Sequence, residues 1–382
     1  MSTSQRNDGD APHIAFVIKY LENASGGAER VLRDVSEQLC EFKFRVSIVT
    51  FDRPEAEAFY PLDSRVQWVK LGKPNASPRI YAGITQLVKQ FDGLLALRHW
   101  LKQEQPDRTI GFLISAYFPL MLAALGLNLP LYGSEHLSYD GTRHGLKNIA
   151  LRASIAMLRR TTVISEAIRQ TFPPAVRSRM MVVPNPIATP TARASKVGKI
   201  EGEKICLAVG RLVSVKDHGT LVKAWAQLKP QFSDWRLRIV GEGQLRPELE
   251  AQIERLSLGN HIELPGHQRD VQREYLRAQL MVTPSRYEGL GLVTAEAIAH
   301  GLPTVGFADC PGTNEIIQHG VNGLLVKPSN NQTRAEALAI TLSELMENHK
   351  KRLALTQASF SLPSTADIAK RWLVFLQLKP AK

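Results

Sequence analysis

Two acidic residues separated by seven positions lie in the segment with the clearest chemical pattern. The segment reads Arg286-Tyr-Glu-Gly-Leu-Gly-Leu-Val-Thr-Ala-Glu296, and its acids are Glu288 and Glu296. Gly289 and Gly291 follow the first acid, and the residues after them predict a helix that stops at a glycine and a proline near position 301. The first acid should therefore lie in a loop, and the second about one turn inside a helix.

This arrangement suits recognition of a phosphorylated sugar. The amides of Leu290, Gly291 and Leu292 would lie near a helix amino terminus, which is a natural site for phosphate. The two carboxylates could then accept hydrogen bonds from sugar hydroxyls on either side of the phosphates. A solvated helix residue is the alternative interpretation of Glu296, and its combination with Glu288 and the glycines disfavours that alternative.

A second loop carries two cations. Arg211 follows Gly210, and Lys216 comes five residues later, between a predicted strand and a helix that we expect Asp217 to cap. Two cations in one loop can neutralise a diphosphate, arginine through a fork of hydrogen bonds and lysine as a point charge. Taken singly, either residue is better explained by a surface salt bridge.

A third loop, Asn23-Ala-Ser-Gly-Gly-Ala-Glu29, follows the first predicted strand. Gly26 and Gly27 would let the backbone approach a ligand closely, and the next helix would offer free amides to an anion. A tight turn between a strand and a helix would look similar, so this loop alone is a weak signal.

Alternating strands and helices must position these loops. Short apolar runs separated by helical stretches indicate an α/β protein with doubly wound parallel sheets covered on both faces. The predicted strands are 14–18, 45–50, 108–114, 129–132, 161–164, 180–184, 205–210, 235–241, 262–264, 280–283, 304–307 and 323–326, and the clearest helices are 28–39, 217–228, 246–257 and 365–378. In such sheets ligands bind at the carboxyl ends of strands, where all three loops fall.

A segment without periodicity divides the chain. Residues 184–203 hold three prolines and two glycines, which is typical of a linker, and 382 residues are too many for one hydrophobic core. We therefore predict two facing Rossmann-like domains with an interdomain cleft. The first spans 12–187 and the second 188–364, and the carboxyl-terminal helix at 365–378 could pack back on the first.

Composition and termini narrow the class of protein. An apolar fraction of 44% and a charged fraction of 22% are ordinary for a globular protein. Three cysteines with no C-x-x-C pair predict neither a disulfide framework nor a zinc ribbon. The polar start of the chain does not resemble a signal peptide, and the apolar stretch 112–132 contains Pro119, Gly126 and Pro130. We interpret that stretch as strand, helix and strand, and expect a cytoplasmic protein.

Competing phosphate and metal motifs are missing from the sequence. Gly241-Glu-Gly243 is followed by Arg246 where a dinucleotide-binding loop needs a third glycine, and neither a G-x-x-x-x-G-K-[ST] loop nor H-E-x-x-H occurs. The D-x-D sequence Asp8-Gly-Asp10 precedes every predicted strand. We therefore expect no metal or other cofactor, and expect cationic side chains and helix amides to neutralise the phosphates.

The net charge of +12 is shared between the two halves of the chain and has one local concentration. Apolar residues at helical spacing over 143–160, with basic residues between them, predict a cationic amphipathic helix that could dock on anionic lipid. A core-facing helix with a solvated basic rim is the simpler explanation for the segment alone. Nucleic acid is not an expected partner, because no recognition motif or stacking-aromatic platform accompanies the charge.

Together these motifs resemble retaining glycosyltransferase family 4, whose two-domain fold is called GT-B. The resemblance spans nearly the whole chain and is most specific in the carboxyl-terminal half. It is carried by Gly26-Gly-Ala-Glu29, Val183-Pro-Asn-Pro186, Gly210-Arg211 with Lys216, Gly241-Glu-Gly243, Glu288 with Glu296, Ala299-His-Gly-Leu-Pro303, and Glu315-Ile-Ile with His319-Gly-Val-Asn-Gly-Leu-Leu325. It implies an acceptor-binding first domain, a nucleotide-sugar-binding second domain, and transfer that keeps the anomeric configuration.

The resemblance also implies a role for each matching residue of the second domain. Arg211 and Lys216 would bind the diphosphate and stabilise it as the leaving group. Glu288 would bind hydroxyls of the donor sugar, residues 289–292 would supply backbone amides, and Glu296 would hold the ribose. Residues around Gly266 would flank the base.

From the first domain, Gly27, with Gly26 beside it, would approach the donor phosphates or the acceptor. His136, in Gly133-Ser-Glu-His-Leu-Ser138, matches the family's active-site histidine, which contacts the donor sugar. Seen alone, a loop histidine is more often structural, and neighbouring Glu135 could simply pair with it.

Two departures from the family pattern stand out. Leu290 occupies the position where the family commonly has phenylalanine, and no carboxylate of the first half is placed as a nucleophile, so attack on the same face is expected without a covalent intermediate.

The predicted activity is transfer of a hexose or N-acetylhexosamine, most simply from a UDP sugar, to a saccharide or lipid-linked saccharide of surface-polysaccharide or lipopolysaccharide biosynthesis. The enzyme would work in the cytoplasm or at the inner face of the membrane. A nucleotide-sugar 2-epimerase of the same fold and a non-catalytic polyanion-binding protein are the alternatives.

Overall fold

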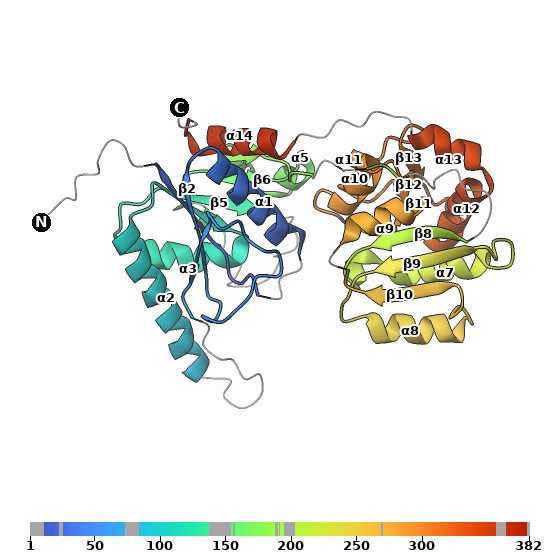
Figure 1. Cartoon of the computed structure of the whole chain (residues 1–382), viewed down its shortest axis with the longest axis horizontal. Coiled ribbons are helices and arrows are strands. Elements are labelled where there is room, and N and C mark those ends of the chain that lie inside the picture. Colours follow the sequence, from blue (N-terminus) through green and yellow to red (C-terminus); the bar gives the residue numbers. More distant parts are fainter. Residues whose placement is uncertain are drawn as a thin grey trace, which may run out of the picture. The chain divides into compact units, whose positions relative to one another are not determined.

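The computed structural model of the chain describes residues 11–22, 26–72, 84–136, 154–155, 157–187, 190, 192–194, 203–268, 270–356 and 364–379, with the backbone alone for 84–91. The chain forms two compact units (Figure 1). The first comprises residues 1–186 together with 363–382, and the second comprises 187–362. The predicted boundary between 187 and 188 lies one residue from the observed division.

The first unit is built on a seven-stranded sheet in which every pairing is parallel. Its strands lie in the order β3-β2-β1-β4-β5-β6-β7, so the direction in which the chain crosses the sheet reverses between β1 and β4. The strands are β1 (His13–Val17), β2 (Arg45–Thr50), β3 (Gln67–Lys70), β4 (Arg108–Phe112), β5 (Leu131–Glu135), β6 (Thr161–Val163) and β7 (Met180–Val182). The helices are α1 (Gly27–Glu41), α2 (Ile84–Glu104), α3 (Ile114–Ala124), α5 (Glu166–Thr171), α6 (Pro174–Arg177) and α14 (Thr365–Leu376).

The carboxyl-terminal helix α14 belongs to the first unit. Trp372 lies against two phenylalanines of the sheet, edge-on to Phe16 at 5.8 Å between ring centroids and stacked on Phe112 at 6.4 Å. The Arg108 guanidinium donates to the carbonyl of Leu376 at 2.8 Å. Burial of this aromatic cluster packs the carboxyl-terminal helix against β1, near the start of the chain, and against β4.

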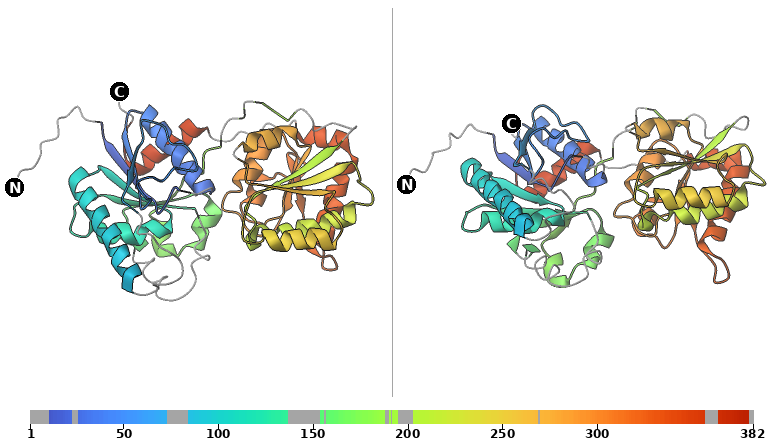
Figure 2. Two further views of the ribbon diagram at one scale, coloured as in Figure 1. Left: turned by 60° about the horizontal axis from the view of Figure 1, so that its bottom comes forward. Right: turned by 90° about the horizontal axis from the view of Figure 1, so that it is seen from below.

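The second unit is built on a six-stranded parallel sheet in the order β10-β9-β8-β11-β12-β13, which reverses between β8 and β11. Helices cover both faces of it (Figure 2). The strands are β8 (Lys204–Val209), β9 (Trp235–Val240), β10 (Ile262–Gly266), β11 (Leu280–Thr283), β12 (Thr304–Phe307) and β13 (Gly323–Val326). The helices are α7 (His218–Leu228), α8 (Arg246–Arg255), α9 (Val271–Arg277), α10 (Leu292–Ala299), α11 (Thr313–Ile316), α12 (Arg334–Glu347) and α13 (His349–Thr356).

The predicted doubly wound architecture is confirmed, and so is the interpretation of the apolar stretch 112–132. That stretch forms the end of β4, the helix α3 and the start of β5. Within the described part of the chain, no helix is long and apolar enough to cross a membrane. Most of the predicted basic helix at 143–160, and Asp8 and Asp10, lie outside the described residues.

Candidate donor site at the strand-order reversal

The order of the strands determines where the candidate site lies. In an open parallel sheet, a ligand crevice lies at the carboxyl ends of the two strands where the strand order reverses. In the second unit these strands are β8 and β11. The loop after β8 carries Arg211 and Lys216, and the loop after β11 carries Glu288. The sheet thus brings together two motifs that are far apart in the sequence.

Lys216 and Glu288 meet directly across these two loops. The Lys216 ammonium donates to both carboxylate oxygens of Glu288, at 2.6 and 2.7 Å, and the Ser285 hydroxyl donates to Oε1 at 2.6 Å. The Glu288 and Lys216 side chains are only 10% and 17% exposed. Sequence reasoning missed this pair, because its members are 72 residues apart and neither motif indicates a contact with the other.

Further contacts hold the same two loops together. The Arg286 amide donates to the carbonyl of Val215 at 2.9 Å, and the Arg286 guanidinium pairs with the Asp217 carboxylate at 2.9 Å. Asp217 occupies the position before α7, as predicted, but it is in the left-handed region with φ of 49° and its carboxylate does not cap the helix. It accepts a hydrogen bond from the Thr220 hydroxyl instead, so the predicted capping interaction is wrong.

Arg211 lies one residue after Gly210 in the loop that follows β8, and it is exposed. Within the described part of the chain, its side chain makes no ion pair or hydrogen bond. The loop therefore presents one cation to solvent at Arg211 and holds the second, Lys216, against a carboxylate.

Close backbone packing explains the second glycine motif, Gly241-Glu-Gly243. A Cβ atom on Gly241, whose φ is 149°, would lie 2.0 Å from the carbonyl oxygen of Gly210, and one on Gly243 would lie 2.4 Å from the carbonyl oxygen of Leu212. The glycines let the turn after β9 pack against the loop after β8. Gly266, which ends β10 with φ of 77°, accepts a hydrogen bond from the Gly241 amide at 3.0 Å and so joins the same edge of the sheet.

The acidic segment has the predicted local structure. Glu288 lies in the loop, Gly291 precedes α10 in the left-handed region with φ of 62°, and Glu296 lies in the second turn of the helix. Glu296 is 4% exposed, and its carboxylate accepts a hydrogen bond from the Tyr275 hydroxyl of α9 at 2.9 Å. The alternative interpretation of Glu296 as a solvated helix residue is therefore wrong.

In the first unit, His136 directly follows β5 and is buried. The Ser134 hydroxyl lies 3.2 Å from its Nε2, and its ring lies 4.8 Å from that of Phe112. Burial lowers the pKa of His136 to about 3, so the imidazole is neutral at physiological pH. Glu135, which could pair with this histidine, accepts a hydrogen bond from the backbone amide of His136 at 2.8 Å.

The glycine loop of the first unit also lies at a strand-order reversal, because it follows β1, which neighbours β4. Gly26 precedes α1 with an extended backbone, and Gly27 is the exposed first residue of that helix. The Glu29 carboxylate lies so close to Gly26 that a Cβ atom there would approach it to 2.3 Å. The sheet therefore places the predicted residues Gly26, Gly27 and His136 at the carboxyl edge of the first unit.

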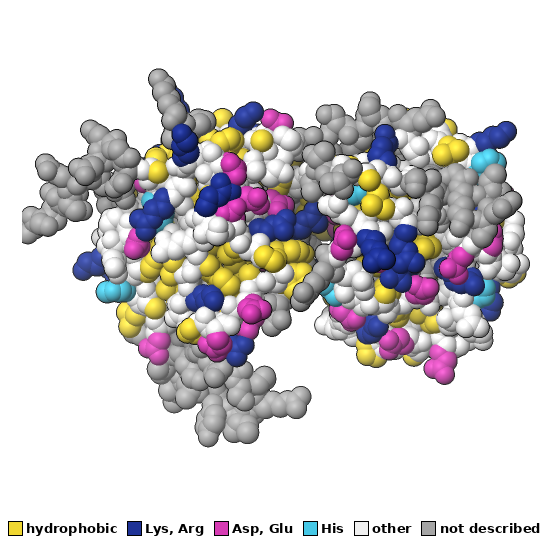
Figure 3. Space-filling view, viewed as in Figure 1, with side chains coloured by type: hydrophobic (Ala, Val, Ile, Leu, Met, Phe, Trp, Pro, Cys, Tyr) yellow, Lys and Arg dark blue, Asp and Glu magenta, His cyan; other side chains and the backbone are white. Residues whose placement is uncertain are grey.

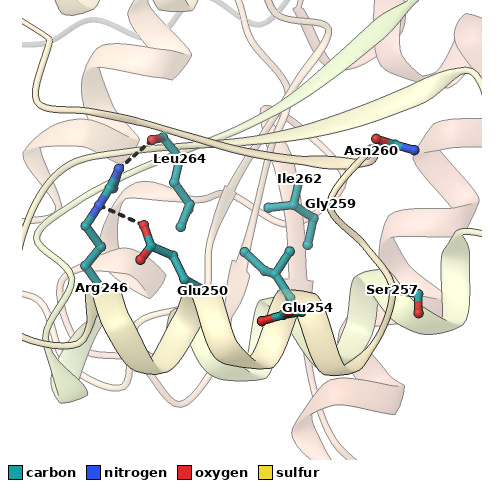
Figure 4. Close-up of a pocket in the computed structure, with 9 residues that line it drawn as sticks. Arg246, Glu250, Glu254, Ser257, Gly259, Asn260, Ile262 and Leu264 are labelled. Atoms are coloured by element: carbon teal, nitrogen blue, oxygen red, sulfur yellow. Dashed lines mark hydrogen bonds and ion pairs between the residues drawn. The ribbon is translucent and has the colours of Figure 1, made fainter.

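One hollow of the second unit lies apart from all the predicted residues (Figure 4). It has a volume of about 560 Å³ and lies between α8 and β10, the edge strand of the sheet. Its arginine, Arg246, pairs with Glu250 at 3.1 Å and donates to the carbonyl of Leu264 at 2.9 Å, so this cation is already paired. Among the described residues, no three His, Cys, Asp or Glu side chains are grouped to hold a metal ion.

Two family models match this chain in succession. The first, described as Glycosyltransferase Family 4, matches residues 25–190, and the second, described as Glycosyl transferases group 1, matches residues 191–361. Their common border lies within a few residues of the division between the two units.

Several known proteins that are similar to this chain are named as glycosyltransferases. A protein of Campylobacter jejuni named GalNAc-α-(1→4)-GalNAc-α-(1→3)-diNAcBac-PP-undecaprenol α-1,4-N-acetyl-D-galactosaminyltransferase is 29% identical, over 89% of this chain and 91% of its own. The lipopolysaccharide 1,6-galactosyltransferase of Escherichia coli is 26% identical, over 83% and 85%. The crystal structure of Anabaena HepE with UDP and glucose matches with a TM-score of 0.71 and 20% identity, over 95% of this chain and 97% of that one.

Proposed function

We propose that this chain, which is a glycosyltransferase of the GT-B fold, is a retaining enzyme of family 4 that takes a hexose or N-acetylhexosamine from a UDP sugar. The assignment of the donor site rests on one observation. A lysine and a glutamate, each suited to a different part of a nucleotide sugar, meet at the strand-order reversal of the second unit. The two family models, which together span residues 25–361, support the assignment to a glycosyltransferase.

The donor would lie along the carboxyl edge of the second unit. Arg211 and Lys216 would bind the diphosphate, and the amides of residues 289–292 at the start of α10 would add partial positive charge. Glu288 would accept hydrogen bonds from hydroxyls of the donor sugar. Glu296, held by Tyr275, would bind the ribose, and the turn at Gly266 would flank the base.

In the reaction, the bond between the anomeric carbon and the phosphate oxygen breaks while a bond to the acceptor oxygen forms on the same face of the sugar. The acceptor hydroxyl gives its proton to the departing phosphate oxygen, so no protein nucleophile is required. Lys216 and Arg211 stabilise the charge that develops on the diphosphate, and a metal ion is not needed for this task. From the first unit, the neutral imidazole of His136 would contact the donor sugar, and Gly27 would approach the donor phosphates or the acceptor.

The acceptor would be a saccharide or lipid-linked saccharide of surface-polysaccharide or lipopolysaccharide biosynthesis, as the names of the relatives suggest. The basic segment 143–160 would hold the enzyme at the anionic inner face of the membrane. Figure 3 shows hydrophobic side chains gathered on one face of the first unit, with Lys, Arg, Asp and Glu around them. Failure to sediment with vesicles containing anionic lipid at low salt would remove the membrane part of the proposal.

A thermal-shift screen of UDP, GDP and ADP sugars tests the donor class. A ligand at 100 times its dissociation constant stabilises the protein by about 2.7 kcal/mol, and we expect UDP sugars to give the largest shift.

Incubation of that donor without acceptor, followed by NMR, should leave the sugar unchanged, whereas an epimerised product would indicate a 2-epimerase. Chelator-treated protein should keep its transferase activity, and recovery only with magnesium or manganese would contradict a metal-independent mechanism.

A further inference from the structure

The charge of Lys216 is neutralised before any ligand binds. Both carboxylate oxygens of Glu288 lie within 2.7 Å of its ammonium nitrogen, and the Ser285 hydroxyl holds the carboxylate in place. Because both side chains are largely shielded from water, solvent and salt screen this pair less than a surface ion pair. A diphosphate that binds Lys216 must therefore share it with a fixed negative charge.

The other charged groups near this pair have different partners. The Asp217 carboxylate is paired with Arg286. Among the described residues, Arg211 makes no ion pair with Glu288. The amide of Glu288 donates to the carbonyl of Pro311 at 3.1 Å, which fixes the backbone of the acidic residue against the loop after β12. Glu288 therefore stays beside Lys216 through contacts that a ligand need not disturb.

The donor and the product of the reaction differ in the properties that such a carboxylate can sense. In a nucleotide sugar, the terminal phosphate is esterified and the attached sugar offers hydroxyl groups that can donate to a carboxylate. The nucleoside diphosphate left after transfer has no sugar, and its terminal phosphate carries a further negative charge near neutral pH. Glu288 would attract the nucleotide sugar through hydrogen bonds and would repel the nucleoside diphosphate through its charge.

We propose that Glu288 is a selectivity group that favours binding of the nucleotide-sugar donor over the nucleoside diphosphate product. It does so by competing with the terminal phosphate of the product for Lys216 and by offering hydrogen-bond acceptors that only the donor can use. This inference rests on the proposed function, because it assumes that the diphosphate of a nucleotide sugar lies at Lys216. The consequence is a product that leaves the site readily after transfer.

The test compares the affinities of UDP and UDP-glucose, measured by calorimetry, for the full chain and for Glu288→Gln. Glutamine keeps the shape and one acceptor oxygen but removes the charge. UDP should bind the variant about tenfold more tightly, because a like charge a few ångströms from the phosphate has gone. UDP-glucose should bind no more tightly, so the preference for the donor should fall by about the same factor. An unchanged preference, or an equal loss of both affinities, overturns the proposal.

Two further variants make the test specific. Asp309→Asn, in the loop after β12, removes the same charge as Glu288→Gln. The Asp309 carboxylate pairs with Arg334 and does not contact Lys216, so the preference for UDP-glucose over UDP should stay as in the wild type. If Glu288→Gln proves unstable, Glu288→Met removes the same charge with a side chain of similar length and should give the same change in preference. A wild-type protein that binds neither UDP nor any other nucleotide in the thermal screen would instead contradict the proposed function itself.

Discussion

The two units share the order of their first six strands, to which the first unit adds a seventh, and they differ in the chemistry at their strand-order reversals. The second unit gathers charged side chains there, with Lys216 and Glu288 in contact and Arg211 exposed nearby. The first unit offers the glycine backbone at Gly27 and a buried, neutral imidazole at His136. A doubly wound sheet therefore fixes where a ligand binds, whereas the loops decide whether the site recognises charge or shape and hydrogen bonding.

The largest effect that would test this comparison is expected for Lys216→Ala. In the proposed mechanism this cation stabilises the leaving group, so its loss should lower kcat by about 100- to 1000-fold. The midpoint of thermal unfolding should also fall, because Glu288 loses its cation at a site where it is only 10% exposed, but the fall should be far smaller than the loss of kcat. Steady-state kinetics and calorimetry measure the two quantities. Lys351→Ala, which removes a more exposed lysine paired with Glu344 in the same unit, is the control and should leave kcat unchanged. Proportional losses of activity and stability would make Lys216 structural.

The first unit should lose stability when the packing of its carboxyl-terminal helix α14 is disrupted. Trp372 is 2% exposed and packs on Phe16 and Phe112, so Trp372→Ala should lower the free energy of unfolding of that unit by about 3–5 kcal/mol. Differential scanning calorimetry should show one transition moving down while a second, from the other unit, stays in place. Val374→Ala, on the exposed face of the same helix at 63% exposure, should move neither. A single transition that shifts as a whole would show that the two units unfold together.

Acid should destabilise both units through one buried histidine in each. Burial lowers the pKa of His136 to about 3, and burial together with the charge of Lys216 lowers that of His218 to about 4. Between these values and the unfolded value of about 6.5, the unfolded chain binds the proton and the folded chain does not. Stability should therefore be constant above pH 6.5 and fall below it, by about 1.4 kcal/mol per pH unit for each histidine.

Urea unfolding from pH 7.5 to 4.5 measures this dependence. His136→Gln should reduce the acid sensitivity of the first unit, and His218→Gln should reduce that of the second. His99→Gln on α2 alters an exposed histidine and should leave the curve unchanged. Acid sensitivity that survives both buried substitutions would place its origin in other groups.

Most elements of the fold could be predicted from local patterns, and the failures have two physical causes. Buried parallel strands are continuous apolar runs, which is why β8 or β11 is recognisable, whereas β3 reads Gln67-Trp-Val-Lys70, is partly exposed and gives no such run. The contact between Lys216 and Glu288 depends on how distant strands are ordered, and no local pattern reports that order. The burial of His136 likewise depends on Phe112, which the neighbouring strand β4 supplies.

The smallest effect should come from the more exposed ion pair, Arg286 with Asp217, which also links the two loops of the candidate donor site. Arg286 is 59% exposed, and an ion pair in that environment contributes about 0–1 kcal/mol, so Arg286→Ala should change the free energy of unfolding by no more than this. The hydrogen bond from its backbone amide to Val215 survives the substitution, and the loops should stay joined. The KM for the donor should therefore rise at most a few-fold, and Asp217→Asn should match it. A tenfold or larger rise in KM in both variants would mean that this outer pair, rather than Lys216 with Glu288, positions the loops. The ion pairing that distinguishes the second unit from the first would then lie at the surface of the site instead of in its buried pair.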